Sequence, residues 1–430
     1  MQKEISIGIL GCGTVGTGVV QLLQQKREEF FHKVGVYVNI KKILVKDPEK
    51  NRPDFIPKNL FTNSINDIVN DSEIKIVVEL IGGTEPACSF ILDSIKKGKH
   101  IVTANKEVIA KLGKKIFSTA SDYGVSVYIE GSVGGGIPVI QTFKRNLVSN
   151  KILSFMGIIN GTTNYILTEM STKNREFNEV LKEAQNLGYA ESDPVSDIEG
   201  YDAVYKLAIL SSIIFGHRIE IDEIYREGIS KISSKDILYT KAFGYVIKLL
   251  AIAKHEDNIL QARVHPTLIP VSHPLASVNG VYNALLIKGD AVGDVMLYGQ
   301  GAGMMPTASV VVSDILNIIS EIDNPTPNRL MSCQHKDSCK LTSVNESVNS
   351  CYLRIHTLDQ PGVLGTIGKI FGDSGISINS LLQRKETKED AEIVFITHPV
   401  KWESIKKAVN MLQNFSTIKE ICSVIRIEDI

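Results

Sequence analysis

The residues Gly11-Cys12-Gly13-Thr14-Val15-Gly16 directly follow a strand-like run, Ile5–Leu10, and they decide the fold of the first part of the chain. This G-x-G-x-x-G pattern opens an amphipathic segment, residues 15–25, so it has the strand–turn–helix context of a dinucleotide-binding turn. The glycines let the turn tighten and let the backbone approach a pyrophosphate, whose charge then meets the helix N-terminus. A tight turn without a nucleotide is the alternative.

Further strand-like runs alternate with helical patterns as far as residue 129. They are Ile40–Val45, Ile76–Ile81, His100–Thr103 and Val125–Ile129. Such alternation predicts an α/β domain of the Rossmann type, with a parallel sheet and crossover helices. Ligands bind at the carboxyl ends of the strands in these sheets, where residues 82–84 and 103–106 are expected to lie.

The tip of the second strand, Val45-Lys46-Asp47, bears on the choice of cofactor. An acid at this tip favours a free ribose 2′-hydroxyl, and a cation favours a 2′-phosphate. Because Lys46 comes first, we expect NADP rather than NAD. A solvated loop charge is the other interpretation of Lys46.

Composition and charge exclude several kinds of partner. The 430 residues suffice for about three domains, and 43% hydrophobic with 22% charged residues is ordinary for a globular protein. A formal net charge of -1 gives no field to attract nucleic acid or an anionic membrane. The longest apolar runs, such as residues 207–215, are shorter than the about 20 residues that a bilayer needs. With no export signal after Met1, we expect a cytoplasmic protein that binds a small molecule.

The six cysteines are scattered, so we expect reduced thiols and no disulfide framework. Cys333 and Cys339, with His335 between them, lack the spacing and the second ligand pair of a zinc site. We therefore expect no zinc there.

Composition shifts divide the chain. We expect a nucleotide-binding domain over residues 1–130 and, after the glycine-rich turn that begins at Gly131, an α+β domain over residues 131–322. Residues 323–350 are rich in turn formers and polar side chains and predict a linker. Residues 351–430 have the size of one small α+β module.

The densest group of polar residues precedes and opens a helix at residues 188–207. Asp202 and Lys206 are four residues apart, so they share a helix face. A surface salt bridge worth a few tenths of a kcal/mol is one interpretation. The apolar run over residues 207–215 instead predicts a buried helix, and a buried lysine needs a reason. A desolvated lysine with a lowered pKa can give a proton to a carbonyl oxygen as hydride reaches the carbon.

Five separated segments resemble the homoserine dehydrogenase family and lie in the family's order over residues 1 to about 320. They are Thr103–Lys106 (TANK), Glu130–Pro138 (EGSVGGGIP), Gly157–Asn164 (GIINGTTN), Gly188–Ala208 and Gly299–Ser309 (GQGAGMMPTAS). The resemblance implies an NAD(P)-dependent interconversion of L-aspartate 4-semialdehyde and L-homoserine, a step of threonine, methionine and isoleucine biosynthesis. It also implies a homodimer or higher homo-oligomer.

The same resemblance implies roles for single residues. Lys206 is the expected proton donor and Asp202 its partner, while Glu191 holds the substrate ammonium and Asp197 supports that pocket. Lys106 is expected beside the nicotinamide, where it orients substrate or joins the proton relay. A carboxylate suits an ammonium group; a loop acid that caps the next turn is the alternative for Glu191.

The resemblance also implies cofactor and cation sites. The residues expected at the cofactor are Gly11, Gly13, Thr14, Val15, Gly16, Lys46, Lys106 and Gly301, the last in a segment, about residues 300–322, that returns to the first domain. Many relatives have arginine at the Lys46 position, which leaves the preferred cofactor open. A monovalent cation, usually sodium, is expected on Glu130 and on the carbonyls of Val133, Gly135 and Ile137, where it joins the domains.

The C-terminal module begins with an alternating run, Tyr352–Leu358, and the turn Asp359-Gln360-Pro361-Gly362. With the strand Gly375–Leu382, it resembles the βαββαβ ACT domain, an amino-acid sensor. This implies an effector site at Asp359, Gly362 and Asn379, with L-threonine as first candidate, then methionine or isoleucine. A packing or dimerisation module without ligand is the alternative. Because the linker is polar, we expect truncation near Ser343 to leave a working enzyme that ignores threonine.

Two other functions fit parts of this pattern. One is an NAD(P) oxidoreductase of another small substrate, and the other is a non-catalytic amino-acid sensor that keeps the nucleotide domain as a scaffold. A sensor has no need of the Asp202 and Lys206 pair, so the sequence favours an enzyme.

Overall fold

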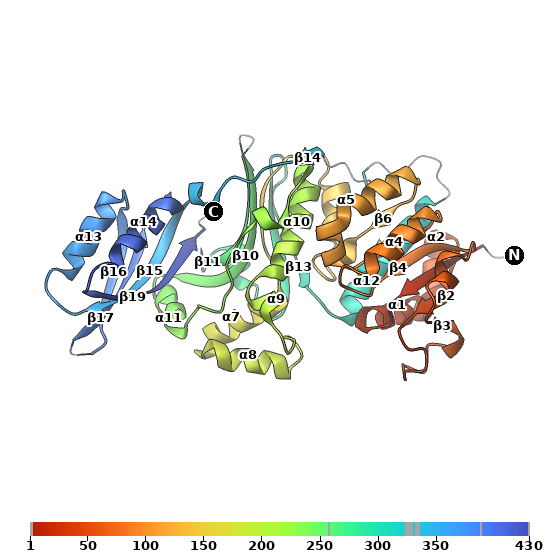
Figure 1. Cartoon of the computed structure of the whole chain (residues 1–430), viewed down its shortest axis with the longest axis horizontal. Helices are drawn as coiled ribbons and strands as arrows, with labels where there is room; N and C mark the ends of the chain where they lie inside the picture. Colours follow the sequence, from red (N-terminus) through yellow and green to blue (C-terminus); the bar gives the residue numbers. More distant parts are fainter. Residues whose placement is uncertain (1–2, 257–258, 323–329, 332–335, 388, 429–430) are drawn as a thin grey trace. The chain divides into compact units, whose positions relative to one another are not determined.

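The computed structural model describes residues 3–256, 259–322, 330–331, 336–387 and 389–428, so Cys333 and His335 lie outside the described residues. The chain forms two compact units, each built from three segments (Figure 1). The first comprises Met1–Ile152, Tyr205–Ile221 and Lys288–Cys339, and the second Leu153–Val204, Asp222–Ile287 and Lys340–Ile430. No described helix is both long enough and apolar enough to cross a membrane.

The first unit contains a six-stranded parallel sheet in the order β3-β2-β1-β4-β5-β6. The strands are β1 (Glu4–Leu10), β2 (Tyr37–Leu44), β3 (Phe61–Thr62), β4 (Ile74–Glu79), β5 (His100–Thr103) and β6 (Val127–Tyr128). This confirms the predicted Rossmann-type sheet. The order changes direction between β1 and β4, which is where sheets of this type bind nucleotides.

Helices cover this sheet. They are α1 (Thr14–Gln25), α2 (Arg27–Val34), α3 (Asn66–Val69), α4 (Ala87–Lys96), α5 (Lys106–Asp122) and α12 (Met304–Glu321). Figure 1 shows α12 lying beside α1, although almost 280 residues separate them in the sequence. Their close approach depends on Gly18, because a Cβ there would lie 2.9 Å from the Met304 carbonyl oxygen. Fully buried Ile7, Val78 and Ile315 lie in the shared core.

The second unit is built around a mixed sheet. Its central strands run in the order β12-β7-β10-β11, with β7 (Ile152–Ile158), β10 (Tyr245–Glu256), β11 (Ile259–Pro270) and β12 (Tyr282–Gly289). β10 is antiparallel to both β11 and β7. The helices of this part are α7 (Gly161–Lys173), α8 (Phe177–Asn186), α9 (Val195–Ile198) and α11 (Ser234–Ala242), and α10 (Tyr201–Phe215) begins here.

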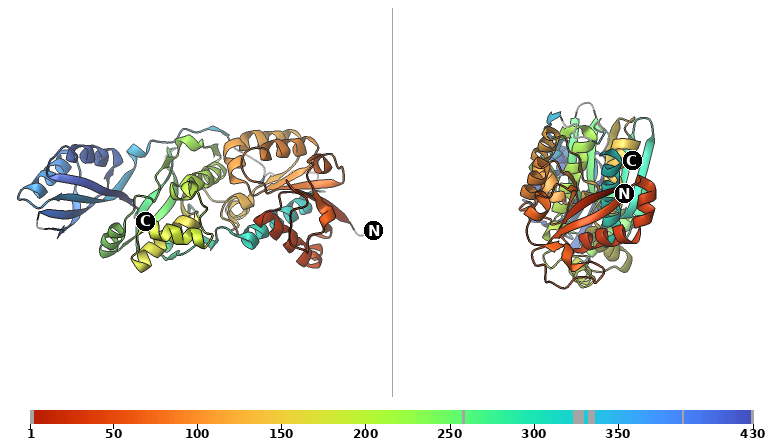
Figure 2. Two further views of the ribbon diagram at one scale, coloured as in Figure 1. Left: turned by 60° about the horizontal axis from the view of Figure 1, so that its bottom comes forward. Right: turned by 90° about the vertical axis from the view of Figure 1, so that its right-hand side faces the viewer.

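The C-terminal residues form the predicted βαββαβ module. Its elements are β15 (Val348–Leu358), α13 (Val363–Asp373), β16 (Ile378–Lys385), β17 (Asp390–Thr397), α14 (Trp402–Leu412) and β19 (Ile418–Ile427). The strands follow the order β19-β15-β17-β16, and Figure 2 shows both helices on one face of this sheet. Phe371 and Ile405, one from each helix, pack in the same core.

The C-terminal module is not an isolated body. β19 pairs in parallel with β11 through Thr267 with Arg426 and Leu268 with Ile427, so one sheet runs from the central strands into the module. The polar linker had predicted an independent domain. The module is instead attached to the second unit because β19 pairs with the edge of β11. These strands are far apart in the sequence, so no local sequence pattern predicts their pairing.

Candidate active site

The turn between β1 and α1 places the predicted glycine motif at the carboxyl end of the parallel sheet. Gly11 has a φ of +102°, and a Cβ there would lie 2.8 Å from the Leu80 carbonyl oxygen, so other residues would be strained. A Cβ on Gly16 would lie 2.3 Å from the Gly11 carbonyl oxygen. Helix α1 begins at Thr14 without a side-chain cap, and Gly13 and Thr14 are exposed. The amides of this first turn are therefore able to receive a phosphate.

The ends of β4 and β5 are joined by hydrogen bonds that centre on Glu79. This carboxylate is fully buried and accepts a hydrogen bond from the Thr103 hydroxyl at 2.6 Å and from two backbone amides. Asn105 caps α5 by accepting from the Val108 N–H at 3.2 Å, so half-buried Lys106 is the first residue of that helix. Sequence analysis did not single out Glu79. Its only sequence signal is an acid that directly follows the apolar run Ile76–Val78.

Two kinds of basic side chain lie near the tip of β2. Lys46 is exposed, as is the neighbouring Asp47. Arg52, which the sequence analysis did not single out, lies over the Phe61 ring at 4.7 Å from its centroid. Burial raises the pKa of the Cys12 thiol in the glycine turn, and the Arg52 guanidinium partly opposes that rise. A guanidinium stacked on Phe61, whose strand pairs with the end of β2, therefore lies near the tip of β2 in addition to the predicted lysine.

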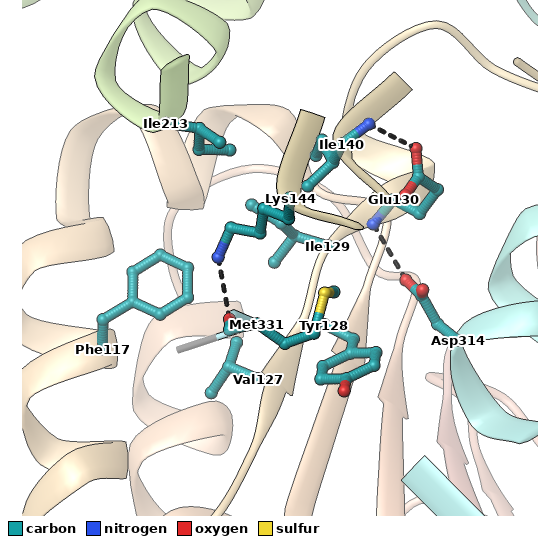
Figure 3. A pocket seen from close by; sticks show the side chains of 10 residues that line it. All are labelled: Phe117, Val127, Tyr128, Ile129, Glu130, Ile140, Lys144, Ile213, Asp314 and Met331. Carbon is teal, nitrogen blue, oxygen red and sulfur yellow. Dashed lines mark hydrogen bonds between the residues drawn. The ribbon is translucent and has the colours of Figure 1, made fainter. Parts of the chain in front are cut away.

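The residues predicted to hold a cation follow β6 (Figure 3). Glu130 begins a short 3-10 helix and is 2% exposed, and its carboxylate accepts from the N–H groups of Ile140 at 2.7 Å and Gln141 at 2.8 Å. Its own N–H donates to Asp314 Oδ2 at 2.8 Å. Burial raises the pKa of Glu130 to about 7, and burial together with Glu130 raises the pKa of Asp314 well above its ordinary value. Two buried carboxylates provide the hard oxygen atoms that suit a cation.

The other predicted cation ligands, Val133, Gly135 and Ile137, lie in the turn that follows. Gly135 has a φ of +58°, and a Cβ there would come within 2.3 Å of the Gly301 carbonyl oxygen. The structure thus brings Gly301, predicted at the cofactor, against the predicted cation turn. Among the described residues, no group of three or more histidine, cysteine or acidic side chains could hold a metal ion. Only a site made largely of backbone carbonyls fits here.

The second unit brings Asp197 and Asp202 together. Asp202 is 2% exposed and Asp197 is half-buried. The Nδ2 group of Asn160 donates to Asp197 Oδ1 at 2.7 Å and to Asp202 Oδ2 at 2.9 Å. Asn160 Oδ1 accepts from the Thr163 N–H at 2.9 Å, which caps α7. One neutral amide therefore joins the carboxylates of α9 and α10.

Glu191 lies apart from this amide-joined pair, in an exposed loop between α8 and α9. The Gln185 side chain donates to the Glu191 carbonyl at 3.1 Å, and the Thr162 hydroxyl donates to the Tyr189 carbonyl at 2.7 Å. These bonds fix the loop backbone. Glu191 itself is exposed.

Lys206 follows Asp202 by one turn of α10. The sequence predicts a buried lysine here, but the structure shows Lys206 half-buried, while Leu207 and Leu210 are fully buried. The prediction differs because Ala203, Val204 and Leu207 face the core, whereas Tyr205 and Lys206 between them are only partly buried. A lysine at the edge of a buried helix face can bury its stem and keep its ammonium near solvent.

The predicted effector residues Asp359, Gly362 and Asn379 are all exposed. Gly362 has a φ of +94° and precedes α13, and Asp359 forms an ion pair with Lys385 at 3.5 Å. No described hydrogen bond joins the three residues to one another. All three therefore lie on the surface of the C-terminal module.

A second charged cluster fastens the C-terminal module to α11. Arg354 of β15 donates from Nε to Asp236 Oδ1 and from Nη1 to Glu392 Oε1, both at 2.8 Å. The hydroxyls of Tyr352 and Tyr239 donate to Asp236 at 3.1 Å and to Glu392 at 2.8 Å. We call Arg354, Asp236 and Glu392 with their two tyrosines the arginine clamp. No local sequence pattern predicts it.

A parallel sheet with a glycine turn at its first strand, joined in one chain to an acidic group beside a helical lysine, defines an NAD(P)-dependent oxidoreductase. Comparison with known proteins narrows this class. Residues 11–130 match the model of the homoserine dehydrogenase NAD binding domain, residues 138–316 that of homoserine dehydrogenase, and residues 352–413 that of the ACT domain.

Relatives resemble the chain over its whole length. The homoserine dehydrogenase of Synechocystis sp. is 46% identical over 98% of this chain and 99% of its own. A solved homoserine dehydrogenase from Thiobacillus denitrificans is 41% identical with a TM-score of 0.93 over 99% of both chains. A hyperthermophilic archaeal homoserine dehydrogenase mutant, solved in complex with NADPH, is 26% identical with a TM-score of 0.63 over 75% of this chain and 100% of its own.

The chain therefore belongs to the homoserine dehydrogenase family, as an NAD(P)-dependent oxidoreductase with a C-terminal ACT domain. The predictions of fold class, activity and nicotinamide cofactor are confirmed. The individual site residues stay predictions.

Proposed function

We propose that the acidic residues of the second unit bind the ammonium group of L-homoserine and that Lys206 exchanges the proton of its hydroxyl. The observation that carries this proposal is the amide-joined pair of Asp197 and Asp202, of which Asp202 lies one helical turn before Lys206 in α10. Negative charge held there attracts an amino-acid ammonium and favours a protonated lysine.

The proton step follows from these positions. When L-homoserine is oxidised, its hydroxyl proton passes to the neutral Nζ of Lys206 while the carbon loses hydride. In the reverse direction the Lys206 ammonium gives the proton to the carbonyl oxygen of L-aspartate 4-semialdehyde. Asp202 orients that ammonium. A bound nicotinamide cofactor supplies or accepts the hydride.

We assign Glu191 to the substrate ammonium, with Asp197 supporting the pocket, and Lys106 to substrate orientation. The support for Glu191 is a loop whose backbone is fixed while its carboxylate stays exposed and available. The position of Lys106 is fixed by the Asn105 cap. The direct test follows reduced-nicotinamide absorbance with L-homoserine in the parent and in Asp202→Asn. Parent-like turnover by Asp202→Asn would overturn the proton step assigned to Asp202 and Lys206.

For the cofactor, we propose the turn formed by Gly11, Gly13, Thr14, Val15 and Gly16, together with Lys46, Lys106 and Gly301, and a preference for NADP. The support is the uncapped start of α1 and the basic charge near the tip of β2. Comparing the Michaelis constants for NAD and NADP tests the preference.

The domains have separate proposed roles. Residues 1–130 with the return segment bind the nucleotide, residues 131–322 form the catalytic and dimerisation domain, and residues 351–430 regulate the activity.

We propose that a monovalent cation, with sodium first, is held by Glu130 and the carbonyls of Val133, Gly135 and Ile137. It would supply structural support, since its ligands lie in a turn against Gly301. The expected readout is a rise in melting temperature with NaCl over choline chloride at equal ionic strength. An equal melting temperature in both salts would count against the site.

For regulation, we propose that L-threonine binds at Asp359, Gly362 and Asn379 of the ACT domain and inhibits. Coupling of about 1 to 3 kcal/mol would shift apparent affinity about 5- to 150-fold. Truncation near Ser343 no longer makes a clean control, because it uncovers β11 and leaves Asp236 without Arg354. Threonine, methionine and isoleucine should instead be titrated into the full chain and into Asp359→Asn. Identical curves would remove this site.

We further propose a homodimer. Residues 131–322 are its expected dimerisation domain, and the edge strand β16, with Ile378 37% and Leu381 41% exposed, offers a further surface on which a second copy could pair. Light scattering after size exclusion measures the mass directly. We also propose that the protein is cytoplasmic, as predicted from the sequence. Cell fractionation tests this location.

A further inference from the structure

We infer that Asn160 is a positioning residue of the reaction: its one amide group holds two carboxylates side by side. The inference rests on the proposed function, since it concerns Asp197 and Asp202. Asn160 touches neither substrate nor cofactor in this assignment. It acts through the two aspartates.

The orientation of the Asn160 amide follows from hydrogen-bond chemistry. Its Oδ1 accepts from the Thr163 N–H at 2.9 Å and from the Thr163 hydroxyl at 3.0 Å. A flipped amide would point its NH₂ at the Thr163 N–H and its oxygen at two carboxylates, so these three contacts would be repulsive. The two hydrogens of Nδ2 therefore point at Asp197 and Asp202, at 2.7 and 2.9 Å.

The amide suits this task better than a charged group would. Two carboxylates close together repel, and such pairs commonly take up a proton to relieve the repulsion. A lysine or arginine in place of Asn160 would relieve it too, but would neutralise the charge that the substrate ammonium needs. An amide donates one hydrogen bond to each acid and adds no charge.

Asn160 is also held firmly in place. It is 5% exposed and lies between the end of β7 and the start of α7, so two regular elements fix its backbone. One turn further along α7, Asn164 donates to two backbone carbonyls and accepts from buried Lys248 at 3.1 Å. The first turn of α7 is therefore anchored before substrate arrives.

The test uses Asn160→Asp in the full chain. Aspartate is as good a helix cap as asparagine, so α7 is kept while both donated hydrogen bonds are lost and a third carboxylate joins the pair. We expect kcat/KM for L-homoserine to fall about 100-fold near pH 7.5 and to recover at least about tenfold toward pH 9.5, as the proton taken up by the three acids leaves. The KM for the nucleotide should change less than about twofold.

Asn164→Asp is the matched control, because it makes the same change at equal depth in the same helix. It loses two donated hydrogen bonds as well, but its new carboxylate meets the Lys248 ammonium and, among the described residues, no other acid. It therefore tests for loss of stability and for an added buried charge, and its kcat/KM should lack the recovery toward pH 9.5 expected of Asn160→Asp. A profile of Asn160→Asp that runs parallel to the parent, or parent-like kcat/KM, would overturn the inference.

Asn160→Ser covers the case in which Asn160→Asp does not fold. Serine keeps a cap but cannot reach both acids, so the KM for L-homoserine should rise about tenfold without recovery at high pH; an unchanged KM would overturn the inference. The variant Asp202→Asn distinguishes a failure of the proposed function from a failure of the inference about Asn160. If it works as the parent does, the proposed function fails and Asn160 has nothing to position, whereas an impaired Asp202→Asn beside a parent-like Asn160→Asp overturns the inference alone.

Discussion

Two acidic pairs in the second unit are held in different ways. Asp197 and Asp202 share a neutral amide, whereas Asp236 and Glu392 share the guanidinium of Arg354. Both pairs are hydrogen-bonded and geometrically fixed, but the group that joins the first is neutral and the group that joins the second is a cation. The amide of Asn160 therefore fixes position alone, and the arginine fixes position and adds positive charge.

Electrostatics agrees with a structural role for the arginine clamp. Burial works against ionisation of Glu392, but hydrogen bonds from Tyr239, Lys235 and Arg354 hold its pKa below the ordinary value. Arg354 is 8% exposed and Asp236 is fully buried. A buried, mutually satisfied set of charges makes a contribution that is lost when one member is removed.

Replacing Lys206 tests the catalytic side of the comparison and has the largest expected effect. Lys206→Ala should lower turnover about 10² to 10⁴-fold, the range for loss of a general acid, with cofactor affinity little changed. Lys206→Arg should be nearly as poor, because a guanidinium keeps its proton near neutral pH. Steady-state kinetics at saturating substrate measures this. Turnover within about threefold of the parent in both variants would remove Lys206 from the mechanism.

Replacing Arg354 should give the opposite signature. Arg354→Met removes the cation that buried Asp236 and Glu392 share and should cost about 3 to 5 kcal/mol of the free energy of unfolding, with turnover near the parent value at low temperature. Lys401→Met, which breaks the exposed ion pair with Glu346, is the control and should cost less than about 1 kcal/mol. Denaturant titrations compare them. Equal stability of Arg354→Met and Lys401→Met would contradict the clamp.

The sequence was sufficient where a local pattern fixes the backbone. The glycine turn of residues 11–16 needs positive φ and close approach, and the alternation of strands and helices determines a parallel sheet. The turn at residues 359–362 likewise predicted the βαββαβ module. In each case neighbouring residues carry the signal, so no knowledge of distant contacts is required.

The two acidic pairs lay beyond sequence reasoning because their partners are far apart in the chain. Asn160 reaches acids 37 and 42 residues away, and Arg354 reaches one 118 residues away. Nothing local distinguishes Asn160 from any other helix cap. The burial of Lys206 was overestimated for a related reason: the apolar run predicts a buried helix, but which side chains at its edge reach solvent depends on packing.

Replacing Glu191 tests an acid that is exposed, in contrast to the two hydrogen-bonded acidic pairs. Glu191→Gln should raise the Michaelis constant for L-homoserine, because the ammonium loses a charged partner worth on the order of 1.5 to 3 kcal/mol. Turnover at saturation should fall less than in Lys206→Ala. Glu199→Gln, a half-buried acid outside the proposed site, serves as control. A constant that stays put for homoserine but rises for the nucleotide would make the assignment wrong.

Replacing Lys46 has the smallest expected effect and compares two basic side chains near the cofactor turn. Arg52 is stacked on Phe61, whereas Lys46 is exposed. An exposed charge contributes about 0.2 to 1 kcal/mol, so Lys46→Ala should raise the Michaelis constant for NADP about two- to fivefold and that for NAD less. Arg52→Met should discriminate more, because a guanidinium binds a phosphate through paired hydrogen bonds. Both constants should be measured for each variant, with Lys50→Ala as the exposed control. If Lys46→Ala affects both cofactors equally, its ammonium lies in solvent, and an equally silent Arg52→Met would show that neither residue reads the 2′-phosphate.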